Sequence, residues 1–319
     1  MKEIIAVAVS IAIALLAVLY LTPRIASLYR QAGIMRKNYI GREITPSLGP
    51  IISLSWIPAL VWLSFWSAGG TPSDAGAGRT VFPLAVLMLG LTAVGLLDDV
   101  LNESTRGYRG HFLSLKEGRL TMGMLKALWG AALAVLVVLN FDFPGVNLPA
   151  GSAAASLPVV LLSKAAAILT ILFWTNGLNF LDRRPGRALK VFLFLGLAIS
   201  FRGLAGYRSA AQVWASASGL SGEGYPGPLI LMLPLLVIVL TLLPADLGGG
   251  AMLGDAGANP LGAVLGLYGL LMLPFWGRLL FLLLGLMLNL AGERVSLSAV
   301  IDQNRFLSFL DRLGYHTKK

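Results

Sequence analysis

The chain has 319 residues, of which 56% are hydrophobic and only 13% are charged. A soluble domain of this length would carry about twice that share of charged residues. The absence of cysteine excludes disulfides, thiolate catalysis and cysteine-ligated metals, and the two histidines are too few for a multi-histidine metal site. The composition therefore predicts a polytopic integral membrane protein.

Apolar segments near 20 residues in length recur along the chain, and roughly 20 residues are needed to cross about 30 Å of hydrocarbon. These segments are continuously apolar rather than alternating, and lipid-exposed backbone must satisfy its hydrogen bonds within the segment, so we expect helices. The predicted fold is all-α, a membrane helical bundle of about nine transmembrane helices. The predicted spans are Ile4–Leu21, Ser47–Trp66, Val81–Leu97, Thr121–Leu139, Leu157–Thr175, Ala188–Ser200, Pro228–Leu243, Pro260–Phe275 and Leu279–Leu290.

The basic residues are distributed unequally between the two alternating sets of loops. Nineteen of the 25 lysines and arginines fall in the set that includes Arg36, Arg106, Arg184 and the C-terminal segment. Cytoplasmic loops are enriched in lysine and arginine, so this set is expected to be cytoplasmic, with the N-terminus outside and the C-terminus inside. The net charge of +10 then reflects membrane orientation, and we expect no nucleic-acid partner.

The chain is expected to consist of a transmembrane domain, 1–295, and a cytoplasmic amphipathic tail, 296–319. No internal repeat or soluble domain is recognisable. The apolar residues of the tail recur at a spacing that suits one amphipathic helix lying on the inner membrane surface. These residues are Val300, Ile301, Phe306, Leu307, Phe309, Leu310 and Leu313.

Acidic and amide side chains follow or precede three of the predicted spans. They belong to the sequences GLLDDV (95–100), TNGLNFLDRRPGR (175–187) and MLGDAGANPLG (252–262). The predicted topology puts all three segments at the cytoplasmic end of the bundle, so we expect their polar side chains to form one site. These side chains are Asp98, Asp99, Asn176, Asn179, Asp182 and Asp255.

Carboxylates from several loops beside a basic rim are the groups that bind Mg²⁺ together with a nucleotide diphosphate. Magnesium takes one or two protein carboxylates and completes its shell with phosphate oxygens and water, and lysine or arginine balances the remaining phosphate charge. Structural interpretations stay open for each residue. Asp98 or Asp99 can cap a helix end or pair with a nearby arginine. Asp255 can cap a helix that starts near Asn259, and Lys126 can snorkel from a helix end.

The motifs, in this order, resemble those of the polyprenyl-phosphate N-acetylhexosamine-1-phosphate transferases, which include the phospho-N-acetylmuramoyl-pentapeptide transferases. The resemblance extends from about Arg36 to Gly262. MRKNYIGREITPSLGP (35–50) is similar to the family's RKxHxxPxPxxGG segment, and GLLDDV is similar to its paired-aspartate motif. GRLTMGMLK (118–126) resembles the lysine-bearing segment of the family. NGLNFLD resembles the first half of NxxNxxDGxDGL, and MLGDAGANPLG resembles the glycine–aspartate motif.

The resemblance implies Mg²⁺-dependent transfer of a sugar-1-phosphate from a UDP-amino sugar to undecaprenyl or another polyprenyl phosphate. UMP is released, and the product serves cell-envelope polysaccharide or peptidoglycan biosynthesis. The resemblance further implies a bacterial inner-membrane enzyme whose site faces the cytoplasm, with Mn²⁺ as an alternative cofactor and a homodimer as an alternative to a monomer. The implied roles are catalysis by Asp98 and Asp99, metal binding by Asp255, and substrate binding by Lys37, Lys126, Asn176, Asn179 and Asp182.

Three departures from the family pattern bear on this expectation. DGxDGL reads DRRPGR here, so Pro185 replaces the second aspartate and Arg183, Arg184 and Arg187 surround it. The histidine-rich loop is missing, with only His316 near the C-terminus, and no tenth span follows. The donor sugar therefore stays open. Two other interpretations also stay open. The chain could be a catalytically degenerate relative that binds or regulates lipid-linked envelope intermediates, or it could be a transporter of such intermediates.

Overall fold

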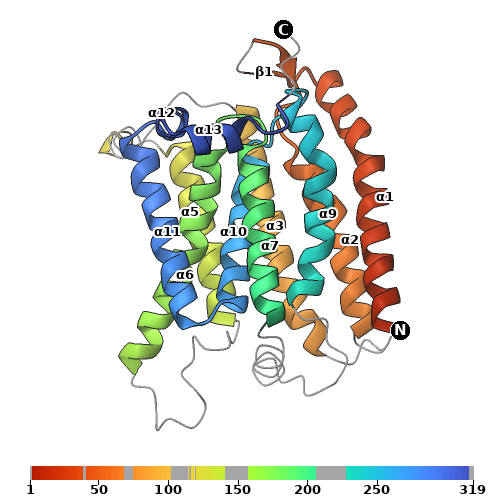
Figure 1. The fold of residues 1–319 in the computed structure, drawn as a ribbon, viewed down its shortest axis with the longest axis vertical. Helices are drawn as coiled ribbons and strands as arrows, with labels where there is room; N and C mark the ends of the chain where they lie inside the picture. Colours follow the sequence, from red (N-terminus) through yellow and green to blue (C-terminus); the bar gives the residue numbers. More distant parts are fainter. Residues whose placement is uncertain are drawn as a thin grey trace.

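The computed structural model describes residues 2–38, 41–67, 75–101, 114, 116–118, 120–140, 157–205 and 228–315. Within these residues the chain forms eleven helices and one two-stranded hairpin. Figure 1 shows the long helices side by side in one bundle, with the short helices α12 and α13 lying across the end that is opposite the start of α1. The predicted all-helical architecture is confirmed, apart from the hairpin, whose strands have two residues each.

Nine long helices lie where nine spans were predicted. The sixth and ninth predicted spans were the shortest, and both extend into flanking residues as α7 and α11. The long helices are α1 (Lys2–Gln31), α2 (Gly49–Ser67), α3 (Ala75–Leu101), α5 (Met122–Asn140), α6 (Leu157–Leu181), α7 (Arg187–Ala205), α9 (Pro228–Leu247), α10 (Asp255–Met272) and α11 (Phe275–Arg294). The remaining elements are α12 (Leu297–Gln303), α13 (Arg305–Arg312), β1 (Arg36–Lys37) and β2 (Glu43–Ile44).

Seven helices in the described part of the chain are long and apolar enough to cross a membrane, namely α1, α2, α3, α5, α6, α9 and α11. Large apolar side chains are exposed on the outer faces of the bundle, an arrangement that suits lipid and would be unfavourable in water. Length, composition and surface together indicate a multi-pass membrane protein. Examples of these exposed side chains are Leu16, Leu136, Leu162, Phe194 and Met287.

Helix α10 is enclosed by other helices. Every residue from Ala256 to Met272 is buried, and the helix packs most extensively against α6 and α3. Asp255 lies in its first turn, and Asn259 follows about one turn later. The predicted helix start near Asn259 is wrong. The helix begins at Asp255 because its first amides are capped by a side chain from α3.

Glycine allows two neighbouring helices to approach the first turn of α10. A Cβ atom on Gly49 would lie 2.1 Å from the backbone carbonyl of Ala256, and one on Gly95 would lie 2.6 Å from the backbone of the same residue. Both distances are well below van der Waals contact, so only glycine fits at these positions. The start of α10 is therefore held between α2 and α3, next to the end of α3 that carries Asp98 and Asp99.

Candidate functional site

The ends of α3 and α6 and the start of α10 meet at one end of the bundle. Lys126 Nζ, from α5, donates a hydrogen bond to Asp98 Oδ2 at 2.6 Å, and the same ammonium binds Asp255 Oδ2. Asn179 Nδ2 donates to Asp255 Oδ2 at 3.4 Å. The side chains of Asp98, Lys126 and Asp255 each remain about one-fifth exposed. Two carboxylates from different helices thus converge on one cation, and solvent can reach all three groups.

Asp99 differs from its neighbour Asp98 in its surroundings. It is only 3% exposed, and its two carboxylate oxygens accept hydrogen bonds from the backbone amides of Asp255 and Ala256, each at 3.0 Å. A carboxylate at a helix N-terminus is favoured by the unpaired amides and by the helix dipole. Asp99 therefore caps α10 from another helix, whereas Asp98 faces the cluster.

Gly254 and Asp182 fix the turn that leads into α10. Gly254 has a φ of 69°, in the left-handed region, and its amide donates to Asp182 Oδ2 at 3.0 Å. A Cβ atom on Gly254 would lie 2.6 Å from Asp99 Oδ2, so both conformation and space require glycine. Burial raises the pKa of Asp182, and the nearby carboxylates of Asp246 and Asp255 raise it further. The protonated form of Asp182 is therefore more favoured than in an exposed aspartate.

The segment after α1 borders the same cluster. The backbone of Thr45 pairs in parallel with the strand-like stretch after α9, and Met252 N donates to Thr45 O at 3.1 Å. Arg36 Nη2 donates to the backbone carbonyl of Asp98 at 3.3 Å. Lys37, the basic residue predicted to bind substrate, is exposed on β1. The basic side chain of β1 that reaches the cluster is therefore Arg36 rather than Lys37.

A cavity of about 340 Å³ lies beside the cluster, between α3, α5, α6, α10 and α11. Its polar lining includes Lys126, Asn176 and Asn179, and Asn176 Nδ2 donates to Asn289 Oδ1 at 2.7 Å. A lining of mixed polarity suits an amphipathic ligand. Its apolar lining includes Leu91, Val94, Leu172 and Phe173.

Sequence reasoning missed two polar residues of this region. Asp246, buried at the end of α9, accepts the amide of Gly186 at 2.7 Å. Asn289 on α11 holds Asn176 and also donates to backbone carbonyls of α6 and α11. The signal for Asn289 was its position inside an apolar span, where an amide requires a partner. Asp246 and Asp255 lie at the two ends of the connection between α9 and α10, but the spacing of Asp246 matched no motif.

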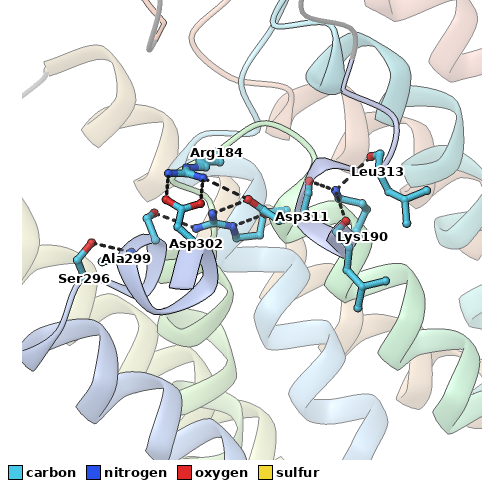
Figure 2. Close-up of polar contacts among 10 residues, drawn as sticks. Arg184, Lys190, Ser296, Ala299, Asp302, Asp311 and Leu313 are labelled. Atoms are coloured by element: carbon cyan, nitrogen blue, oxygen red, sulfur yellow. Dashed lines mark hydrogen bonds and ion pairs between the residues drawn. The ribbon is translucent and has the colours of Figure 1, made fainter. Parts of the chain in front are cut away.

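Arg184 and Arg187, from the segment DRRPGR (182–187), bind the C-terminal tail. Arg184 Nη1 and Nη2 donate to the carboxylate of Asp302 at 2.8 and 2.6 Å, as Figure 2 shows. Arg187 Nε and Nη2 donate to the carboxylate of Asp311 at 2.7 and 2.9 Å. The Arg187–Asp311 pair is buried, with 4% exposure of each side chain, whereas both members of the Arg184–Asp302 pair are at least one-third exposed.

The tail forms two short helices, so the prediction of one amphipathic helix is wrong. Asn304 lies between them, and its Oδ1 accepts the amides of Phe306 and Leu307 at 3.0 and 3.1 Å. Asparagine is favoured at a helix N-cap because its side chain replaces the missing backbone acceptor. Asn304 is thus both the C-cap of α12 and the N-cap of α13.

The donor set suits a divalent cation that is bound together with phosphate. Among the residues that the structure describes, no group of three or more histidines, aspartates or glutamates is arranged to hold a metal ion. Mg²⁺ needs only one or two protein carboxylates when phosphate oxygens and water complete its shell, and Asp98 and Asp255 already share one cation position. Asp99 and Asp182 accept backbone amides and hold the turn at the start of α10.

No known protein-family model matches the chain, and a search of curated proteins finds no significant match.

Proposed function

We propose that the chain is a Mg²⁺-dependent glycosyl-1-phosphate transferase of the membrane. An oxygen of polyprenyl phosphate forms a bond to the sugar-bearing phosphorus of a UDP-amino sugar. The bond from that phosphorus to the oxygen bridging the two phosphates breaks, and UMP leaves with that oxygen. The observation that carries the proposal is the convergence of Asp98 and Asp255 on Lys126 beside a cavity of mixed polarity. The order of the motifs in the sequence adds support.

Asp98, Asp255 and the Asn179 amide are the groups that would hold Mg²⁺ with the donor diphosphate. When bound, Mg²⁺ neutralises charge on the pyrophosphate and stabilises its cleavage. Lys126 then exchanges its carboxylate partners for phosphate oxygens, which offsets their negative charge.

Asp99 and Asp182 act as positioning residues in this mechanism. Their carboxylates bind the amides of Gly254, Asp255 and Ala256, so they fix the direction in which the Asp255 side chain leaves the helix. Because Asp99 is buried and both of its oxygens are engaged, Asp98 is the member of the pair that can act at the metal and phosphates.

The lipid substrate is proposed to lie in the cavity between α3, α5, α6, α10 and α11. Its phosphate faces Lys126 and Asn176, and the first part of the prenyl chain lies against Leu172 and Phe173. Apolar lining with a few convergent polar groups is the usual composition of such a binding site.

We further propose nine membrane crossings in a bacterial inner membrane, with the N-terminus outside and the site facing the cytoplasm. α7 and α10, with 19 and 18 residues, rise about 27–29 Å at 1.5 Å per residue, close to the hydrocarbon thickness. The chain has no cysteine, so single cysteines at Lys2 and Gln303 report sidedness directly. Labelling of both positions from the same side of sealed vesicles would contradict this orientation.

The transfer reaction is tested with purified protein, Mg²⁺, undecaprenyl phosphate and a panel of UDP-sugars, with UMP release as the readout. We expect Asp98→Asn and Asp255→Asn each to reduce turnover by about 100-fold or more without lowering the melting temperature. Asp99→Asn should lower both turnover and melting temperature, because an amide oxygen satisfies fewer of the α10 amides. Asp302→Asn, in the tail, is the matched control and should keep wild-type turnover.

The same assay distinguishes a working transferase from a catalytically degenerate relative. UMP formation should stop when EDTA removes the metal and return when Mg²⁺ is restored. Release of no UMP from any donor, in a preparation that binds undecaprenyl phosphate, would refute the transferase and favour a degenerate relative. Full turnover in Asp255→Asn would remove Asp255 from the site.

A further inference from the structure

Helix α13 has one face attached to the bundle. Asp311 lies on this face, is 6% exposed and is held by the two hydrogen bonds from Arg187. Lys190 Nζ donates to the backbone carbonyls of Leu310, Asp311 and Leu313 at 3.0, 2.5 and 3.3 Å, as Figure 2 shows. A lysine at these carbonyls satisfies the acceptors that the end of α13 leaves open and complements the helix dipole. The attachment therefore fixes both the position and the rotation of α13.

The opposite face of α13 is apolar, exposed and bordered by basic residues. Phe306 and Phe309 are 68% and 63% exposed. At about 100° per residue they lie roughly 60° apart around the helix, while Asp311 lies on the far side. Arg305 and Arg312 fall along one edge of the phenylalanine face by the same geometry. An apolar face with a basic edge is typical of helices that lie in the membrane interface.

The attachment point continues a surface that already faces lipid. Lys190 shares one side of α7 with Phe194, Leu197 and Phe201, since these residues follow at four, seven and eleven positions. Their exposed fractions are 71%, 45% and 68%, so this stripe of α7 faces outward from the bundle. Figure 1 shows α13 lying across the bundle axis near the start of α7. The attached end of α13 thus lies where this outward stripe of α7 begins.

We propose that α13 is an interfacial anchor, attached to the bundle by Arg187 and Lys190 and inserted through Phe306 and Phe309 into the adjacent lipid leaflet. Helices of this kind bury their apolar face about 5–10 Å into the boundary between headgroups and acyl chains, with basic residues near anionic headgroups. Such an anchor would hold the tail at the membrane whether or not the transfer reaction takes place. It also gives a function to the arginines that depart from the family motif, because they hold the anchor.

The experiment places an environment-sensitive NBD fluorophore on single cysteines in the cysteine-free full chain. Phe309→Cys reports on the proposed inserted face, and Gln303→Cys, an exposed polar position at the end of α12, is the matched control. Both labelled proteins are placed in nanodiscs of phosphatidylcholine and phosphatidylglycerol containing doxyl-labelled lipid. We expect blue-shifted emission at position 309 and quenching by doxyl lipid at least roughly twofold stronger than at position 303.

Two outcomes would overturn the anchor. The first is weak doxyl quenching of similar size at positions 309 and 303. The second is a position 309 label that is shielded from aqueous iodide yet not quenched by doxyl lipid, because protein rather than lipid would then cover the face. A second label at Phe306→Cys, which keeps Phe309, guards against local disruption and must give the same result. Size-exclusion profiles of all labelled proteins must match the unlabelled chain.

Discussion

The buried ion pair between Arg187 and Asp311 should dominate the attachment of the tail. Its two hydrogen bonds measure 2.7 and 2.9 Å, both side chains are 4% exposed, and Arg187 Nη1 also donates to Ser298 Oγ at 3.1 Å. Asp311→Asn leaves a buried guanidinium without a carboxylate, a change that costs about 3–5 kcal/mol. We expect the lower value, because an opened tail lets water reach Arg187. About 3 kcal/mol corresponds to roughly 100-fold in the equilibrium between attached and open tail.

The neighbouring Arg184–Asp302 pair provides a more exposed control, and Arg184 Nη1 also lies 3.5 Å from Asp311 Oδ2. Arg184 and Asp302 also form two hydrogen bonds, at 2.8 and 2.6 Å, but these side chains are at least one-third exposed. Exposed ion pairs contribute little, so Asp302→Asn should change the same equilibrium by no more than about fivefold.

Hydrogen–deuterium exchange of peptides covering 297–313, measured in nanodiscs, reports this equilibrium. Protection should fall by about 100-fold in Asp311→Asn and only slightly in Asp302→Asn. The double substitution Arg187→Met with Asp311→Leu should recover much of the protection, because it removes both charges together. Equal effects of the two single substitutions, or unchanged protection in Asp311→Asn, would refute the claim that burial sets the strength of the attachment.

Two further predictions follow from the packing and the pKa values. Gly95→Ala should lower the free energy of unfolding by about 3 kcal/mol or more, because its Cβ would overlap the backbone of α10. The control Gly130→Ala, whose Cβ would meet only side chains at 3.6 Å or beyond, should be neutral or slightly stabilising in thermal unfolding. Equal losses of stability in the two variants would contradict this prediction. Although burial acts to raise it, the hydrogen bonds and charge of Arg187, with nearby cations, hold the pKa of Asp311 below its usual 3.8. Because this pKa is depressed, the ionised carboxylate stabilises the attached tail at higher pH, and the stabilisation is lost when acidification protonates Asp311. NBD emission from the tail should therefore be constant from about pH 8 to 5 and change only below the ordinary carboxyl pKa. Release of the tail near pH 6 would contradict this prediction.

The helices could be predicted from sequence because hydropathy depends on local composition. The start of α10 could not, since Asp99, on a different helix, caps its first amides. The hairpin after α1 was also missed, because strands of two residues are too short to produce an alternating pattern.

The candidate site was predictable as a group of residues but not in its division of roles. Sequence placed Asp98 and Asp99 together, and only the packing of α3 against α10 directs one carboxylate to Lys126 and the other to backbone amides. Arg184 and Arg187 were noted as departures from a motif. Their partners lie more than a hundred residues later in the chain, and a charge pattern along a sequence does not identify such partners.

The start of α10 also limits how this end of the molecule can recognise an anion. Helix N-termini often bind phosphate through free amides, yet here the amides of Gly254 and Ala256 are already engaged by Asp182 and Asp99. The protein fills its own anion-binding helix end with internal carboxylates. Under the proposed transfer reaction, a phosphate would be bound by a long, rotatable side chain such as Lys126, which can exchange its carboxylate partners for phosphate oxygens. Backbone amides at the helix end are fixed in direction, so they could not follow a phosphate that moves during the reaction.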